Sequence, residues 1–213
     1  MRGGARVTVT ARSLLFWPLK PFWRLLLRVI PTPDPWERLG YRVSARRFGP
    51  GSTHDFAWYF EGGSDVPVSS VDDIAQWLLG CEYVTDPDLF RVADYWQHPR
   101  TFEQIRRGDC EDHAVWAWRK LVELGYDADL VAGRCLPWTP GAEDSERTHA
   151  WVMFRRDGAS YLFETTSKIK EHMVRPLADV SSTYRPELGV DKQRKSFTFG
   201  GALLTIRERE LSR

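Results

Sequence analysis

Three residue types that together perform nucleophilic acyl transfer follow one another along the chain. Cys110 lies between two acids, His149 follows 39 residues later, and Glu164 lies beyond it. A cysteine thiolate attacks an acyl carbon, an imidazole holds the proton, and a carboxylate orients the ring and stabilises the imidazolium. The pattern predicts a Cys110–His149–Glu164 triad.

The same residues also have a structural interpretation. A free cysteine packs as a small hydrophobe, which we expect of Cys81 and Cys135, and a lone histidine is more often a satisfied residue than a functional one. For Cys110 the catalytic interpretation is favoured, because the structural one needs three independent coincidences: a thiol at a helix start, a histidine on a strand and an acid on the partner strand.

The thiol is expected at the start of a helix. Asp109 is a good N-cap, an apolar stripe follows it, and Gly125 marks the end. The first turn of a helix carries unpaired N–H groups that favour negative charge. We therefore expect the pKa of Cys110 to be lowered and its backbone N–H to stabilise an oxyanion. His113, one turn further on, is a second-choice base.

Strands are expected after this helix, at 129–136, 150–154, 160–165 and 197–199. Asp157-Gly158 is a strong two-residue hairpin signal. Counting outward from that turn, residues 154–156 face 159–161, which places His149 opposite Glu164 or a neighbour.

The earlier part of the chain gives weaker signals. Residues 41–48 and 55–60 are expected as a strand hairpin, and helices are expected over 70–80 and from Pro87 through Trp96. The polar loop before His149, 137–147, is expected either to shape a cleft or to be a solvated connector.

Three segments in combination resemble the bacterial transglutaminase-like cysteine peptidases. They are Asp94-Tyr95-Trp96-Gln97-His98-Pro99, Gly108-Asp109-Cys110-Glu111-Asp112 and His149-Ala150-Trp151-Val152, and the likeness covers about residues 70–168. The resemblance implies an α+β, papain-like core with a nucleophile helix on an antiparallel sheet. It implies a triad whose acid is Glu164, where many relatives use Asp.

The resemblance also bears on the surroundings of the thiol. It implies that Trp96 and Gln97 border the cleft or the oxyanion site, whereas a match of Gln104 to the donor glutamine of papain-like enzymes looks accidental. In one branch of these peptidases, acids beside the cysteine bind calcium, so Asp109, Glu111 and Asp112 are candidate ligands of a Ca²⁺ ion. The alternative is that acids in a first helical turn simply favour the dipole. No other cofactor is expected.

Composition bounds the remaining possibilities. The chain has 213 residues and a net charge of +1, but its first 30 residues hold six basic and no acidic side chains, which leaves −5 for the rest. This balance argues against nucleic-acid binding by the core. Three cysteines do not indicate a disulfide framework. No apolar run reaches the length of a membrane span, and a cytoplasmic protein is expected.

The proline cluster at 31–35 divides the chain. We expect a basic, aromatic N-terminal arm and linker over 1–35 and a catalytic domain over 36–213. The arm would either lie on a membrane surface or a protein partner, or fold onto its own domain. Hydrolysis of a protein or peptide amide is the expected activity. The alternatives are amine transfer, which crosslinks proteins, and a catalytically silent peptide-binding domain.

Overall fold

The computed structural model describes residues 20–40, 42–135 and 147–212, with side chains from residue 25 onward. Its centre is a six-stranded sheet in the order β6-β5-β4-β3-β7-β8, in which each neighbouring pair is antiparallel. The strands are β3 (Asp127–Cys135), β4 (Arg147–Arg156), β5 (Ala159–Phe163), β6 (Val174–Pro176), β7 (Tyr184–Val190) and β8 (Ser196–Thr198). A separate parallel pair joins β1 (Glu82–Tyr83) to β2 (Arg107–Gly108).

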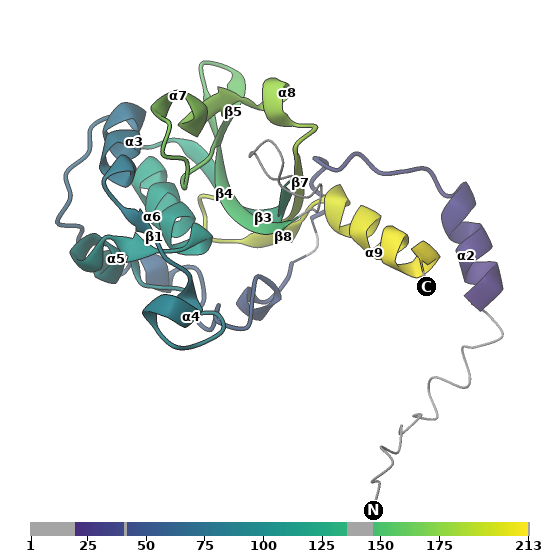
Figure 1. Cartoon of the computed structure of the whole chain (residues 1–213). Helices are drawn as coiled ribbons and strands as arrows, with labels where there is room; N and C mark the ends of the chain where they lie inside the picture. Colours follow the sequence, from purple (N-terminus) through teal and green to yellow (C-terminus); the bar gives the residue numbers. More distant parts are fainter. Residues whose placement is uncertain (1–19, 41, 136–146, 213) are drawn as a thin grey trace, which may run out of the picture.

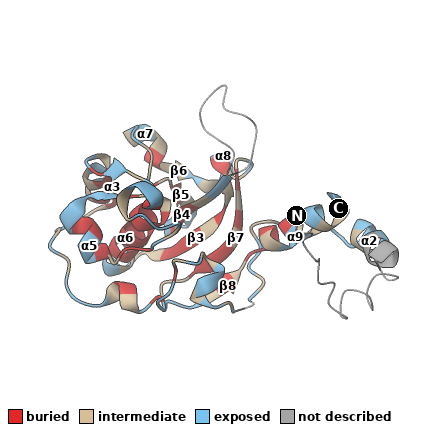
Figure 2. Ribbon diagram, turned by 60° about the horizontal axis from the view of Figure 1, so that its bottom comes forward, coloured by how far each residue is buried: buried red, intermediate tan, exposed pale blue. Residues whose placement is uncertain are grey.

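Helices gather on one face of this sheet. In Figures 1 and 2, α3, α5 and α6 lie together on that face, and α6 contacts both β3 and β4. The helices are α2 (Lys20–Val29), α3 (Val71–Leu79), α4 (Asp86–Leu89), α5 (Pro99–Ile105), α6 (Cys110–Glu123), α7 (Lys170–Met173), α8 (Leu177–Val180) and α9 (Gly200–Ser212). The predicted α+β class is therefore confirmed, with the Cys110 helix packed on an antiparallel sheet.

The central helix, α6, begins where the sequence predicts. Asp109 is its N-cap, and a capping box joins the side chains of Asp109 and Asp112 to each other's backbone N–H groups. Every residue from Glu111 to Leu121 is buried. A helix buried all round is held firmly by its neighbours, so the position of Cys110 at its N-terminus is fixed relative to the sheet.

The hairpin between β4 and β5 has the predicted register. Phe154 pairs with Tyr161 and Arg156 pairs with Ala159. Asp157 and Gly158 both have positive φ, at 51° and 79°, as a type I′ turn requires. Because the turn fixes the register, the chain beyond Phe163 returns beside the start of β4, where His149 lies.

The hairpin expected over 41–48 and 55–60 is wrong, and residue 41 lies outside the described residues. The segment forms two short 3-10 helices, Ala45–Arg47 and Trp58–Phe60. Asp55 accepts the N–H groups of Ala57 and Trp58, which tightens a turn instead of extending a strand. The aromatic residues that suggested a strand form a ring cluster instead; it contains Phe48, Phe56, Tyr59, Trp96 and Trp118.

The helix expected from Pro87 through Trp96 is also wrong beyond its first turn. α4 ends at Leu89, and Arg91 has a φ of 62°, which no α-helix allows. The buried carboxylate of Asp86 accepts the N–H of Tyr95 at 2.6 Å, so the chain folds back on the start of α4. Trp96 consequently lies in an extended segment, where it points into the ring cluster.

Apolar residues cover both faces of the sheet. The larger core lies between the sheet and helices α3 and α6, and includes Ile74, Leu78, Trp116, Trp118 and Phe154. The smaller core lies on the opposite face and includes Val131, Trp151, Tyr184 and Phe197. β7, which the sequence analysis missed, borders β3 and carries Tyr184 into the smaller core.

α2 lies beside α9 and apart from the helices that cover the sheet (Figures 1 and 2). Arg207 on α9 donates to the carbonyl of Ile30 at 3.2 Å and to the hydroxyl of Thr32 at 3.1 Å. Leu25 and Val29 on α2 are more than half exposed. None of the helices in the described residues has the length and apolarity of a bilayer span. The boundary near residue 35 stays a prediction, and the loop 137–147 falls almost wholly outside the described residues.

Candidate active site

Cys110 lies in the wall of a cavity between the start of α6 and the N-terminal part of β4. This cavity, which we call the thiol cavity, has a volume of about 500 Å³ and includes Cys110, His149 and Trp96 in its wall. The thiol comes from the first residue of α6 and the imidazole from the third residue of β4. Two of the predicted triad residues therefore share one cavity.

Glu164 is joined directly to the imidazole. Its Oε2 lies 2.8 Å from Nε2 of His149, and both side chains are 13% exposed. Three further groups donate to the carboxylate: the hydroxyl of Tyr184 at 2.8 Å, and the hydroxyl and backbone N–H of Thr166 at 2.6 and 3.1 Å. The predicted proximity of His149 and Glu164 is confirmed, and the acid is held in a fixed orientation.

The pKa values of this pair shift in opposite directions, because each group stabilises the charged form of the other. Burial alone would raise the pKa of Glu164, but the imidazolium and the surrounding hydroxyl groups outweigh it and lower the pKa to about 2. Burial alone would lower the pKa of His149, but the Glu164 carboxylate outweighs it and the pKa is raised above the ordinary value. With Nε2 committed to Glu164, Nδ1 is the nitrogen left for a second proton partner.

The thiol itself departs from expectation. Its Sγ donates to Oε2 of Glu111 at 3.2 Å, and no hydrogen bond joins it to the imidazole within the described residues. Burial and the nearby carboxylates of Glu111 and Asp109 raise the pKa of Cys110 well above its ordinary value, against the favourable N–H of Ala150. The predicted lowering of this pKa is wrong, because burial and the acids beside the thiol favour the protonated form.

Those acids are part of a larger carboxylate cluster. Asp86 and Asp94 approach Glu111, while Asp86 also approaches Asp109 and Asp112. Burial and the neighbouring carboxylates of Asp109 and Asp94 raise the pKa of Asp86 to about 6. Burial also raises the pKa values of Asp109, Glu111 and Asp112, helped in each case by another carboxylate of the cluster. Burial and mutual repulsion thus both favour the protonated forms of these acids.

The cluster has the composition of a divalent-cation site. Within each of two groups, Asp86–Asp94–Glu111 and Asp86–Asp109–Asp112, the carboxylate oxygens lie within 4.8 Å of one another. Oδ1 of Asp86 and Oδ1 of Asp109 are buried without a hydrogen-bond partner among the described atoms. Hard oxygen ligands at this density suit Ca²⁺, which takes six to eight of them. The three predicted ligands, Asp109, Glu111 and Asp112, are thus joined by Asp86 and Asp94, which the sequence analysis missed.

The two upstream candidates occupy different positions. Trp96 lies in the wall of the thiol cavity and is 4% exposed. Gln97 is buried behind it and does not border that cavity, as far as the described residues define it. Its side-chain amide donates to the carbonyl of Arg107 at 2.9 Å and to Asp112, and its backbone N–H donates to Asp112 at 2.8 Å. In this geometry Gln97 fixes the upstream segment to α6 through its hydrogen bonds to Asp112.

The second-choice base, His113, lies away from the thiol cavity as the described residues define it. Its ring is fully buried, Nδ1 is 2.7 Å from the carbonyl of Asp109, and burial lowers its pKa to about 4. It packs against Phe102. Gln104 is exposed on α5, as an accidental match would be.

The sequence analysis missed Tyr184, Thr166, Asp86 and Asp94. Thr166 and Asp94 adjoin or belong to segments already singled out, so a local search around those motifs would find them. Tyr184 and Asp86 are separated from the motifs in sequence, and only the sheet order and the fold-back after α4 bring them to the site.

Comparison with known proteins gives a remote similarity of fold. No family model matches the sequence, and no curated protein matches it. Among solved structures, LapG of Legionella pneumophila is similar at a TM-score of 0.46 and 16% identity, over 90% of this chain and 97% of that chain. Calcium-bound and EGTA-treated LapG are similar at a TM-score of 0.43 and 17% identity, over 80% of this chain and 82% and 80% of theirs.

Proposed function

We propose that the protein is a cysteine hydrolase that cleaves a protein or peptide amide through a thioester on Cys110. The observation that carries the proposal is that His149, held by a hydrogen bond to Glu164, lies in the wall of the cavity that contains the thiol. A buried carboxylate that is oriented by four donors and is itself fixed to an imidazole is the arrangement that a triad needs.

The chemistry follows from the free nitrogen of the imidazole. In the neutral ring, Nε2–H donates to Glu164, so Nδ1 accepts the thiol proton as Sγ bonds to the carbonyl carbon of the substrate. The carbonyl electron pair moves to oxygen, where the backbone N–H of Cys110 stabilises it. The carbon–nitrogen bond then breaks, and the leaving amine takes the proton from His149. Water attacks the thioester in the same way and releases the acid and the free thiol.

These reaction steps require the Sγ atom of Cys110 to give up its hydrogen bond to Glu111. Rotation about the single Cα–Cβ bond of Cys110 moves the sulfur within the same cavity, and staggered rotamers of an unbranched side chain interconvert readily. The proton that Sγ now shares with Glu111 would then be directed to His149.

Calcium fits the carboxylate cluster as the ion that favours this change. Asp86, Asp94, Asp109 and Glu111 would hold it, with Asp112 retained by Gln97. A bound divalent cation would neutralise the negative charge that raises the pKa of Cys110. With that charge neutralised, the cluster would oppose the thiolate less.

A catalytically silent peptide-binding domain is the second candidate. It is favoured by one observation, the raised pKa of Cys110, because a protonated, hydrogen-bonded thiol is inert. The two candidates differ in whether Cys110 reacts with an amide or only borders a bound peptide.

Hydrolysis of a peptide library by single-residue variants separates them. We expect Cys110→Ala to abolish cleavage and His149→Ala to reduce it by about 10²- to 10⁴-fold. Glu164→Gln is expected to cost less, because the amide still holds the ring in place. Cys81→Ala is the matched control, since Cys81 is a buried thiol outside the cavity and should leave cleavage unchanged. Cleavage that persists in Cys110→Ala would reject the mechanism.

The N-terminal arm is proposed as a docking segment for a membrane surface or a protein partner. The exposed apolar side chains of Leu25 and Val29, together with the basic residues before them, support this role. Sedimentation of the full chain and of a chain without residues 1–30 with anionic liposomes tests it. Equal sedimentation of the two chains would exclude the membrane.

A further inference from the structure

A second cavity adjoins the thiol cavity on the far side of the imidazole. It has a volume of about 470 Å³, and we call it the basic cavity. His149, Thr148 and Tyr83 border both cavities, Cys110 borders only the thiol cavity, and Glu164 borders only the basic cavity. The imidazole therefore lies at the junction of two cavities, and together they form a path across the proposed catalytic pair.

The two cavities differ in charge. Among the described residues, five acids line the thiol cavity against a single arginine, Arg47; the acids are Asp86, Asp94, Asp109, Glu111 and Glu187. The described lining of the basic cavity contains Arg147, Lys168, His172 and Arg175, and one acid, Glu164, which is hydrogen-bonded to His149. The basic lining of the second cavity suits a negatively charged group of a substrate.

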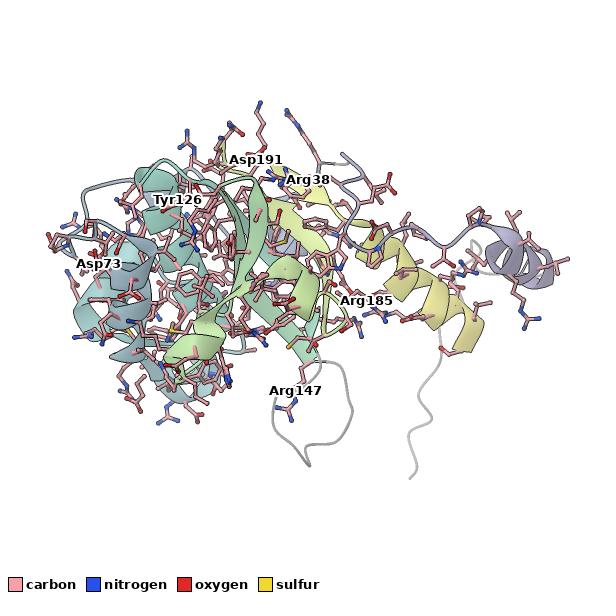
Figure 3. All side chains as sticks on the ribbon, turned by 90° about the horizontal axis from the view of Figure 1, so that it is seen from above. Arg38, Asp73, Tyr126, Arg147, Arg185 and Asp191 are labelled. Atoms are coloured by element: carbon pink, nitrogen blue, oxygen red, sulfur yellow. The ribbon has the colours of Figure 1, made fainter. Side chains whose placement is uncertain are left out.

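The positive charge of the basic cavity is built from separate elements of the fold. Arg147 is the exposed first residue of β4, and it lies at the other end of the sheet from Asp191 (Figure 3). Arg175 belongs to β6. An arginine side chain offers a planar, positively charged set of donors to a carboxylate. Lys168 donates to the carbonyls of Cys81 and Leu78 at 2.6 and 3.2 Å, which fixes its ammonium group, although burial lowers its pKa.

The chemistry of the proposed hydrolysis decides which part of the substrate meets this cavity. His149 must deliver its proton to the leaving nitrogen, so the chain that follows the cleaved bond has to pass on the imidazole side of the thiol. The cavity that contains His149 without Cys110 lies on that side. We propose, on the basis of that function, that the basic cavity binds an acidic side chain or a terminal carboxylate on the leaving-group side of the cleaved bond.

Cleavage-site profiling tests this selectivity. The full chain is incubated with a proteome-derived peptide library, and the new N-termini are read by mass spectrometry. We expect Asp and Glu to be enriched about two- to fivefold over Gln and Asn among the residues that follow the cleaved bond, as one partly exposed charge pair gives. Lys and Arg should be depleted there. High salt should reduce the enrichment, since the pairs are near the surface.

Charge reversal provides the matched comparison. Arg147→Glu should abolish or invert the acidic preference, while Arg42→Glu, an exposed arginine outside both cavities, should retain it. Cleavage that depends on Cys110 but shows no acidic preference, or a preference that Arg147→Glu leaves unchanged, would overturn the inference and leave the hydrolase intact.

A binding measurement separates this inference from the hydrolase itself. If the library is not cleaved, the proposed function fails, and the cavity is then tested on the Cys110→Ala protein with fluorescent peptide pools that differ only in a fixed Glu or Lys. Tighter binding of the Glu pool, lost in Arg147→Glu and kept in Arg42→Glu, supports the basic cavity as a carboxylate site. Equal binding of the two pools overturns it.

Discussion

The hydroxyl of Tyr184 and the imidazole of His149 meet at one carboxylate oxygen, Oε2 of Glu164, each at a distance of 2.8 Å. Tyr184 is the first residue of β7 and His149 lies near the start of β4, and β3 separates the two strands in the sheet. The acid is therefore anchored from both sides, and Tyr184 is a positioning residue of the proposed triad.

Replacing Tyr184 by Phe should weaken catalysis without unfolding the protein. The substitution removes one donor to a buried carboxylate, and a hydrogen bond to a charged group contributes about 1.5–3 kcal/mol. We expect kcat to fall about tenfold or more with little change in KM, measured on one peptide substrate. Tyr126→Phe, a half-buried tyrosine that packs against Phe154, is the control. A kcat equal to that of the parent would show that Glu164 does not need this anchor.

The His149–Glu164 pair should make stability depend on pH in a defined window. The pKa of His149 is raised in the folded state, so its contribution is fully present below the unfolded value of 6.5 and is lost as pH rises through the folded pKa. The pKa of Glu164 is lowered to about 2, so its contribution is present above 4.5 and is lost as pH falls towards 2. The pair therefore stabilises the fold most between about pH 4.5 and 6.5.

Urea denaturation of Cys110→Ala with and without Glu164→Gln measures this contribution. The Gln substitution should cost more free energy of unfolding at pH 5.5 than at pH 9, because the imidazolium that Glu164 pairs with is lost as pH rises. A cost that is the same at both pH values would mean that His149 is neutral in the folded protein throughout.

Calcium should raise the thermal stability of the protein and the reactivity of the Cys110 thiol. A ligand at about 100 times its Kd adds roughly 2.7 kcal/mol, which raises Tm by about 5–10 °C in a chain of this size. Differential scanning fluorimetry in calcium and in EGTA measures the shift, and the alkylation rate of Cys110 should rise with it. Asp94→Asn should reduce both effects, whereas Asp179→Asn, an exposed acid outside the cluster, should not. An identical Tm in calcium and EGTA would contradict a calcium site.

Gln97 should matter for stability. Its backbone N–H and its side-chain amide both donate to the buried carboxylate of Asp112, and an unsatisfied buried group costs about 1–3 kcal/mol. Gln97→Ala removes only the side-chain donor, so we expect the lower part of that range in urea denaturation. Gln104→Ala, on the exposed face of α5, should have a free energy of unfolding close to that of the parent. Equal free energies of unfolding for the two variants would show that the hydrogen bond from the Gln97 side chain to Asp112 does not stabilise the fold.

The parts of the fold that follow local rules could be predicted from the sequence. Asp109 and Gly125 bound α6 through capping chemistry, and Asp157-Gly158 sets the β4–β5 register through its turn type. His149 and Glu164 follow from that register. Each of these signals depends on residues that are close together in the chain, so a single sequence is enough to predict them.

The parts that depend on distant contacts could not be predicted. Aromatic residues between 48 and 60 gave a strand pattern but pack as a ring cluster, since their burial is decided by Trp96 and Trp118. The pKa of Cys110 was predicted with the wrong sign because the helix dipole is a local signal, whereas the burial that raises this pKa depends on the whole fold. Asp86 and Asp94 reach the carboxylate cluster only through the fold-back after α4. Tyr184 joins Glu164 through the sheet order.

The most direct test of the nucleophile is peptide mapping of the full chain after reaction with a peptidyl electrophile in calcium. The protein holds three cysteines, Cys81, Cys110 and Cys135, and none of them forms a disulfide in the described residues. We predict a single adduct on Cys110 that forms at least about tenfold more slowly in His149→Ala. Adducts shared among the three cysteines, or a rate on Cys110 that His149→Ala leaves unchanged, would contradict an imidazole-activated thiol.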